Sequence, residues 1–261
     1  ALHFNRRPAA EPGLPHDLGL YLDRRYQFNG GAEAIYHEFL AHVPVQLFSR
    51  VPEDVLILGG GDGLLAKELL KYGSRVRSIV NVELDPAVAG LAREDQRLRR
   101  LNRDAFHDPK VRLVLDDAFQ FVRGDPGLYD AVYVDFPFPY TYDAAKLYTA
   151  EFFRNVARRL KPGGFGAMDY PLVTQEMQDL GPDAEDLRRN SIAVNTLRAA
   201  GFRTIVPFNT ESPELMVSDK ADLLRPHPDE PERDPETARL LRRVAARRFL
   251  AGHPGARADE R

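Results

Sequence analysis

The sequence contains no cysteine, which excludes disulfide bonds and thiol catalysis and leaves no redox indication of the compartment. It also has no apolar run of about 18 residues or more, the minimum for a helix that spans a bilayer. Residues 1–16 are polar and proline-rich, so they do not resemble a secretory signal peptide. A net charge of only -3 at pH 7 gives no general attraction to nucleic acid or to an anionic membrane.

The histidines do not form a recognisable metal site. The segment "YHEFLAH" resembles the zinc-binding helix of metalloproteases, but that motif needs two histidines four residues apart. His37 and His42 are five residues apart, which places them about 140° apart around a helix. We therefore expect no bound metal.

The composition is that of one large domain with appendages. The chain has 261 residues, of which 43% are hydrophobic, enough for a packed core. Periodicity predicts a β-hairpin over 18–28 after a loose lead-in, and a helix over 33–48 that Pro44 interrupts. A charged, proline-rich linker over 222–235 precedes a predicted C-terminal helix. The predicted segments are residues 1–50, 51–220 and 221–261.

Predicted strands and helices alternate over residues 51–220. The strands are 55–60, 78–84, 111–118, 131–135 and 164–170, and the helices are 64–72, 86–95, 150–160 and 189–202. Such alternation indicates a parallel sheet with helices on both faces. We therefore predict an α/β fold with a Rossmann-like doubly wound sheet, which two further strands over 202–208 and 214–219 close in antiparallel fashion.

A glycine-rich turn follows the first of these strands. The segment "LILGGGDG" contains Gly59, Gly60, Gly61 and Gly63. Glycines between a strand and a helix allow a tight turn and a close approach of ligand to backbone. The dinucleotide fingerprint needs a small residue at position 64, which is Leu64 here. The turn therefore favours the class I methyltransferase-type variant of the fold over NAD binding.

Acidic residues end the next three predicted strands on the same edge as this turn. They are Glu83, Asp117 and Asp135. In an open α/β sheet, ligands bind outside the carboxyl ends of the strands. Glu83, 20 residues after Gly63, can accept both ribose hydroxyls, and Asp117 can accept the adenine amino group. We infer an adenosyl ligand without a required pyrophosphate, namely S-adenosylmethionine or a relative.

Seven segments together resemble the spermidine synthases, or polyamine aminopropyltransferases. The resemblance extends from about Leu20 to about Ser218. Its segments are "LYLDRRYQF", "YHEFLAHVP", "VLILGGGDG", "VELDP", "DPKVRLVLDDAF", "YDAVYVD" and "LYTAEFFRNVARRLKPGG". The stretch "LRRLNRDAFHDPKVRLVLDDAF" and the gapless spacing from Asp135 to "LYTAEFF" look most like the branch in which this domain follows a membrane-embedded N-terminal part.

The resemblance implies decarboxylated S-adenosylmethionine as co-substrate and a small-molecule amine as acceptor. It implies that Asp135 is the central catalytic acid and that Asp62 holds the ammonium of the aminopropyl chain. The implied donor-binding residues are Gln27, Gly59, Gly60, Gly61, Asp62, Gly63, Glu83, Asp85, Asp117 and Ala118. The implied acceptor-binding residues are Tyr36, His37, Asp62, Phe138 and Tyr140.

The loop after Asp135 departs from the family pattern. The family typically has D-x-x-D-P here, whereas this chain has "DFPFP", so Phe138 replaces the second acid. That acid normally helps to hold the cationic acceptor, and loss of one partner of a buried ion pair is costly. We therefore expect an acceptor that is smaller, more apolar or less charged than putrescine, or a different amine. The alternative is that another acid, such as Asp143 or Asp169, binds the acceptor in place of the missing one, so that Phe138 has little effect.

The implied reaction is an SN2 displacement at a carbon beside a sulfonium. Because sulfonium is a good leaving group, the enzyme mainly positions the partners and frees the amine lone pair. An alkylammonium has a pKa near 10.4, so a carboxylate such as Asp135 is needed to accept a proton. The aromatic residues Phe136, Phe138, Tyr140 and Tyr142 would form a lid over the acceptor.

Two other functions remain open from the sequence. An N-methyltransferase would use S-adenosylmethionine itself, although Asp62 would repel the carboxylate of that donor. A nucleoside-binding module without activity has only Phe138 in its favour. We further expect a homodimer through the N-terminal hairpin region and no nucleic-acid partner. The expected location is the cytoplasm, with the cytosolic domain of a membrane protein as the alternative.

Overall fold

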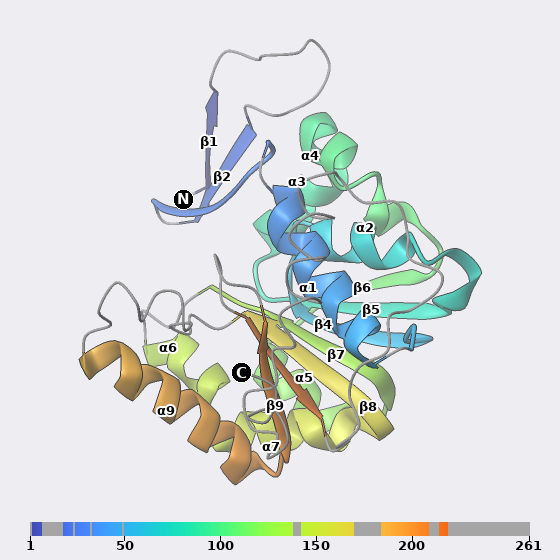
Figure 1. Cartoon of the computed structure of the whole chain (residues 1–261). Coiled ribbons are helices and arrows are strands. Elements are labelled where there is room, and N and C mark those ends of the chain that lie inside the picture. The colour runs from blue at the N-terminus through green and yellow to red at the C-terminus, as the bar shows by residue number, and fades with distance from the viewer. Residues whose placement is uncertain are drawn as a thin grey trace, which may run out of the picture.

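The computed structural model describes residues 2–6, 18–22, 24–31, 33–48, 50–137, 142–169, 184–208 and 214–218. Its centre is a seven-stranded sheet with the strand order β6-β5-β4-β7-β8-β10-β9 (Figure 1). The strands are β4 (Asp54–Gly59), β5 (Ser78–Glu83), β6 (Val111–Leu115), β7 (Tyr129–Asp135), β8 (Leu160–Asp169), β9 (Thr204–Phe208) and β10 (Glu214–Ser218). Strands β4 to β8 are parallel, and β10 lies antiparallel between β8 and β9. The predicted parallel sheet and its antiparallel closure are confirmed.

Helices cover both faces of this sheet, as predicted for a doubly wound fold (Figure 1). One face carries α1 (Glu33–Phe48) and α2 (Leu64–Leu70), and the other carries α5 (Ala118–Gly124), α7 (Ala150–Arg159) and α9 (Ala184–Ala200). The remaining helices are α3 (Pro86–Glu94), α4 (Gln96–Leu101) and α6 (Tyr142–Ala145), with single turns η1 (Gly73–Arg75), η2 (Ala105–His107) and η3 (Lys146–Tyr148).

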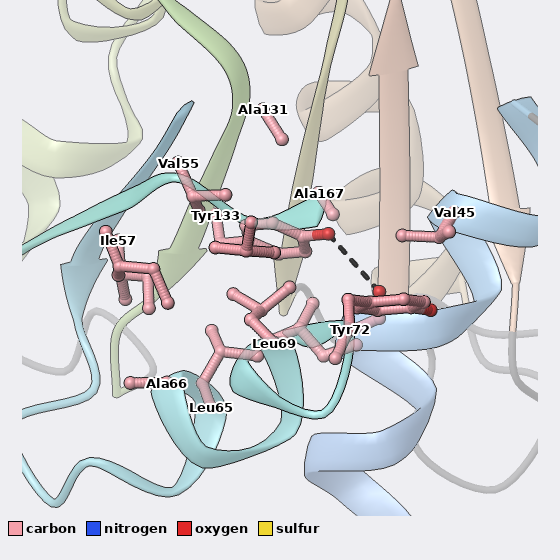
Figure 2. Close-up of a cluster of buried hydrophobic side chains, with 14 of the residues drawn as sticks. Val45, Val55, Ile57, Leu65, Ala66, Leu69, Tyr72, Ala131, Tyr133 and Ala167 are labelled. Carbon is pink, nitrogen blue, oxygen red and sulfur yellow. Dashed lines mark hydrogen bonds between the residues drawn. The ribbon is translucent and has the colours of Figure 1, made fainter. Parts of the chain in front are cut away.

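The alternation of side chains along the central strands divides the core into two parts. Val55 and Ile57 of β4 pack on the face that α1 and α2 cover (Figure 2). The intervening residues, Leu56 and Leu58, pack on the opposite face with residues of α5, α7 and α9. Since both faces of β4 are buried, its sequence is a continuous apolar run rather than an alternating one.

The N-terminal sheet has three strands rather than two. Its strands are β1 (Leu2–Arg6), β2 (Leu18–Leu22) and β3 (Arg25–Asn29). β2 and β3 form the predicted hairpin, with Arg24 in the left-handed region at the turn (φ 65°). β1 pairs antiparallel with β2, so the prediction of a loose lead-in is wrong for these residues. Leu20 and Phe28 join this sheet to the main domain by packing against Leu98 and Phe106.

Pro44 does not interrupt the first helix, contrary to the prediction, because α1 is continuous through it. A proline inside a helix removes one backbone hydrogen bond and commonly bends the helix. Here the residues on either side of it, Val43 and Val45, are buried in the core. The hydroxyl of Tyr133 in β7 also donates a hydrogen bond to the carbonyl oxygen of Ala41, 3.2 Å away (Figure 2). Tertiary packing therefore outweighs the local effect of the proline.

The predicted linker and C-terminal helix of residues 221–261 lie outside the described residues. The predicted division of the chain into three segments stays a prediction. Among the helices that the structure describes, none is both long and apolar enough to cross a membrane.

Candidate active site

The glycine turn between β4 and α2 is held directly against the end of β7. Gly59, Gly60 and Gly63 have positive φ angles of 86°, 60° and 80°. A Cβ on Gly59 would lie 2.1 Å from the carbonyl oxygen of Asp135, and the amide of Gly60 donates to that oxygen over 3.2 Å. Only glycine permits this backbone conformation and this close approach. The turn and Asp135 therefore form one rigid edge.

Glu83, at the end of β5, lies against the same turn. Its Oε2 accepts a hydrogen bond from the amide of Gly61 (3.0 Å), and its Oε1 accepts one from the amide of Asp85 (2.7 Å). Burial raises the pKa of Glu83 to about 6, and the charge of Asp62 adds to that rise, although the backbone hydrogen bonds oppose it. The carboxylate is thus fixed in place, as the predicted ribose contact requires.

Asp62 lies at the tip of the turn, between Glu83 and the end of β7. Its Oδ1 accepts the amide of Leu64 (2.9 Å), and its carbonyl oxygen accepts the side-chain amide of Asn102 (2.8 Å). Burial raises the pKa of Asp62 to about 6; His37 opposes this rise, and the charge of Asp135 adds to it. The residue as a whole is half-buried rather than fully enclosed, so we expect a ligand ammonium to be able to reach it.

Two residues of α1 complete the edge. The hydroxyl of Tyr36 donates to Oδ1 of Asp135 over 2.6 Å. Nδ1 of His37 lies 2.8 Å from the carbonyl oxygen and 3.0 Å from Oε2 of Glu33. Burial by itself would lower the pKa of His37, but the hydrogen bond to Glu33 and the charges of Asp62 and Asp135 raise it to about 9. The structure therefore brings together Tyr36, His37, Asp62 and Asp135, all of which the sequence singled out.

A buried ionic network fixes α1 on α2 behind this edge. Nζ of Lys67 lies 2.6 Å from Glu33 and 3.1 Å from Glu68. Glu68 in turn lies 3.1 Å from His42 and 2.5 Å from Lys71. The hydrogen bond to His37 and the charge of Lys67 hold the pKa of Glu33 below its usual range, and His42, Lys67 and Lys71 do the same for Glu68, although burial acts in the opposite direction. The sequence did not reveal this network, which positions His37 through Glu33.

Asp85 and Asp117 are helix caps in this structure. The side chain of Asp85 accepts the amide of Ala87 (2.8 Å) at the start of α3. Oδ1 of Asp117 accepts the amide of Phe119 (2.8 Å), and its Oδ2 pairs with Lys146 at 2.5 Å. Burial alone would raise the pKa of Asp117, but the hydrogen bond from Lys146 lowers it. An adenine amino group would have to share this carboxylate with Lys146, which the sequence did not indicate.

The other predicted ligand contacts are only partly described. Ala118 is buried at the first position of α5, next to Asp117. Gln27 lies on β3, and its side-chain amide donates to the carbonyl oxygen of Tyr26 over 3.2 Å. Phe138 and Tyr140, the predicted lid and acceptor contacts, lie outside the described residues. Among the described side chains, no group of three or more histidine, aspartate or glutamate residues is arranged to hold a metal ion.

Comparison with known proteins identifies the family of the domain that contains this site. The model of the spermine/spermidine synthase domain matches residues 33–179, which include the glycine turn, Glu83, Asp117 and Asp135. The chain belongs to the spermine/spermidine synthase family. It is 47% identical over 148 residues to a polyamine aminopropyltransferase of Oceanobacillus iheyensis, covering 57% of this chain and 28% of that protein. It is 36% identical over 216 residues to polyamine aminopropyltransferase 2 of Bacillus cereus, covering 80% of this chain and 56% of that protein.

A solved structure supports the fold of this family member. The crystal structure of a spermidine synthase in complex with the transition-state analogue AdoDATO superposes with a TM-score of 0.70 at 22% identity. The superposition covers 94% of this chain and 84% of that one. The Rossmann-like fold predicted from the sequence is therefore confirmed. The chain spans about a quarter to just over half of the length of the two relatives named above.

In this spermine/spermidine synthase family member, Gly61→Ala is expected to weaken binding of the nucleoside donor that the sequence predicts, without unfolding the protein. A Cβ at position 61 would lie 2.3 Å from Oε2 of Glu83, so the carboxylate must move away. We expect the affinity for methylthioadenosine, the nucleoside that remains when the expected donor loses its aminopropyl group, to fall by about tenfold or more in isothermal titration, a loss of about 1.4 kcal/mol. Gly90→Ala is the matched control, because a Cβ there meets nothing within 4 Å. Equal affinities of the two variants would contradict a role for Glu83 in the donor site.

Proposed function

We propose that this chain transfers the aminopropyl group of decarboxylated S-adenosylmethionine to an amine. The observation that carries the proposal is the pair of carboxyl groups of Asp62, at the tip of the glycine turn, and Asp135, at the end of the neighbouring strand β7. The charge of Asp135 raises the pKa of Asp62, and both carboxyl groups raise the pKa of His37, so this edge concentrates negative charge that suits a cationic ligand. The names of the relatives, polyamine aminopropyltransferases, support the same activity.

The residues of the edge fit the proposed donor. Glu83 offers carboxylate oxygens to ribose hydroxyls, and the glycines let the backbone of the turn pack closely against Asp135 and Glu83 at the place where the donor would bind. Asp62 offers its negative charge to the ammonium of the aminopropyl chain. The same charge would repel the carboxylate that S-adenosylmethionine carries at this place, which disfavours the methyltransferase alternative.

The proposed reaction is a displacement at the carbon beside the sulfonium. The amine nitrogen forms a bond to this carbon while the carbon–sulfur bond breaks and its electron pair moves to sulfur, which gives methylthioadenosine. The proton lost by the acceptor ammonium passes to a carboxylate, and Asp135 lies at the centre of the edge for this purpose. Tyr36 fixes the orientation of that carboxylate through its 2.6 Å hydrogen bond.

Asp62 should make the protein discriminate between the two possible donors. In a buffer well above its pKa of about 6, Asp62 is ionised. We expect isothermal titration to show that decarboxylated S-adenosylmethionine binds at least about tenfold more tightly than S-adenosylmethionine. In Asp62→Asn, which keeps an oxygen for the amide of Leu64, the preference should shrink to about threefold or less.

Glu94→Gln serves as the control for this experiment. Glu94 is exposed on α3, so the variant loses the same charge at a distance from the edge. It should retain the preference of the wild-type protein. If wild-type protein binds both donors equally, or binds S-adenosylmethionine more tightly, the proposed donor is wrong.

Further properties follow from the resemblance and stand as proposals. We place a homodimer contact on the N-terminal sheet, of which β1 and β3 are the edge strands. Strands β1 and β2 project from one end of the main domain (Figure 1). The two relatives named above are longer than the stretch that this chain matches. Kinship with a branch in which this domain follows another part of the protein is a proposal that rests on sequence segments. That this part is membrane-embedded, and that the domain works in the cytoplasm, are predictions from sequence segments alone.

A further inference from the structure

Asp169 ends β8 directly beside Asp135. In the parallel pair of β7 and β8, Val134 is in register with Met168, so the next residues, Asp135 and Asp169, are neighbours at the carboxyl edge. Neighbours in register on parallel strands point to the same face of the sheet. The strand order places the glycine turn and Glu83 on one side of Asp135 and Asp169 on the other. Asp169 therefore lies on the side of Asp135 that is away from the proposed donor.

Asp169 has no basic partner among the residues that the structure describes. Burial, and then the negative charge of Asp135, raise its pKa to about 7. The described acids with lowered pKa values all have a lysine or arginine partner; they are Glu33, Asp54, Glu68, Asp95, Asp117 and Asp130. The acids with raised pKa values, by contrast, all lie at the ligand edge; they are Asp62, Glu83 and Asp169. A cationic substrate can supply the opposite charge at this edge.

We propose that Asp169 supplies the second acceptor-side carboxylate in place of the acid that Phe138 replaces, and that it selects a diamine over a monoamine. This inference rests on the proposed function. If Asp169 has this role, the acceptor can carry as much charge as putrescine. The sequence, judged from Phe138 alone, had suggested an acceptor with less charge. Of the two acids that could take over, Asp169 is the one with a described place next to Asp135.

The spacing of the two strands fits a short diamine. Neighbouring strands are about 4.8 Å apart, so Asp135 and Asp169 can each bind one ammonium group of a chain of a few carbons. The nitrogen at Asp135 lies toward the donor and is the one that reacts. The nitrogen at Asp169 stays charged and anchors the acceptor, so Asp169 acts on affinity and specificity rather than on the bond that forms.

Putrescine and butylamine provide a matched pair of probes, because they share a carbon chain and differ by one amino group. Isothermal titration in the presence of methylthioadenosine measures the Kd of each amine. We expect wild-type protein to bind putrescine at least about tenfold more tightly than butylamine. In Asp169→Asn, the preference should fall to about threefold or less, whereas Asp169→Glu and the remote control Glu94→Gln should keep it.

The affinity of each variant for methylthioadenosine reports whether the donor half is intact, and it should not change in Asp169→Asn. An unchanged preference for putrescine in this variant, or equal affinities for the two amines in wild-type protein, would overturn the inference. Amine binding does not depend on turnover. If wild-type protein transfers no aminopropyl group but Asp169→Asn still loses the preference, the proposed function fails and the role of Asp169 stands. If transfer occurs with an unchanged preference in the variant, only the role of Asp169 fails.

Discussion

Replacing Asp135 by asparagine should lower the rate of aminopropyl transfer by about a hundredfold to ten-thousandfold, the usual contribution of a positioned acid or base. Asparagine has nearly the same shape, and its carbonyl oxygen can still accept the hydrogen bond from Tyr36, so the geometry of the edge is kept. What is lost is the negative charge and the ability to accept a proton from the acceptor ammonium. The rate of methylthioadenosine release under saturating donor and amine measures the effect.

Two measurements distinguish a loss of proton transfer in Asp135→Asn from a general loss of folding or donor binding. The affinity of Asp135→Asn for methylthioadenosine should stay within about threefold of wild type, because Asp135 is not among the proposed donor-binding residues. Glu94→Gln, which removes the same charge from an exposed position, should keep the wild-type rate. If Asp135→Asn retains more than about a tenth of wild-type activity, Asp135 is not the main proton acceptor.

Replacing Lys67 by methionine is expected to destabilise the fold by about 3–5 kcal/mol, because it leaves two buried carboxylates without their shared cation. Nζ of Lys67 lies 2.6 Å from Glu33 and 3.1 Å from Glu68, and all three side chains are buried between α1 and α2. Methionine fills a similar volume, so the effect reports charge rather than a cavity. The free energy of unfolding from denaturant titration measures it.

Lys110→Met is the matched control for Lys67→Met. Among the residues that the structure describes, its ammonium donates one exposed hydrogen bond, to the carbonyl oxygen of Gly73, so the change in stability should stay within about 0.5 kcal/mol. Because Glu33 also binds His37, the Lys67 variant should additionally lose activity under conditions where it remains folded. Equal stabilities of the two variants would show that the network does not hold α1 on α2.

The sheet could be predicted because its determinants are local. The run from Val55 to Leu58 is apolar on both faces of the strand. Each such strand is followed by a segment whose apolar residues recur with the spacing of a helix. Two local inferences were wrong for opposite reasons. β1 was missed although Leu2 and Phe4 alternate with polar residues, because a strand of five residues becomes stable only through its distant partner β2. Pro44 was expected to interrupt the first helix, but the packing of α1 in the core outweighs the hydrogen bond that the proline removes.

The edge of the site could also be predicted, since strand order alone places Glu83 and Asp135 beside the glycine turn. The ion pair of Glu33 and His37, four residues apart on one helix, had a local signal that was not used. Lys67 is 34 residues from Glu33, and no local pattern joins them. The pairing of Asp117 with Lys146 is likewise tertiary. The position of Asp169 beside Asp135 also depends on the pairing of β7 with β8, which no local pattern predicts.

The most direct test of the account offers purified protein both donors, each with putrescine, cadaverine, diaminopropane, spermidine, agmatine and butylamine. Mass spectrometry then identifies the group added to the amine and the nucleoside released. The account predicts an aminopropyl adduct of a diamine together with methylthioadenosine, and only with decarboxylated S-adenosylmethionine. A methyl adduct together with S-adenosylhomocysteine would contradict it and make the protein a methyltransferase.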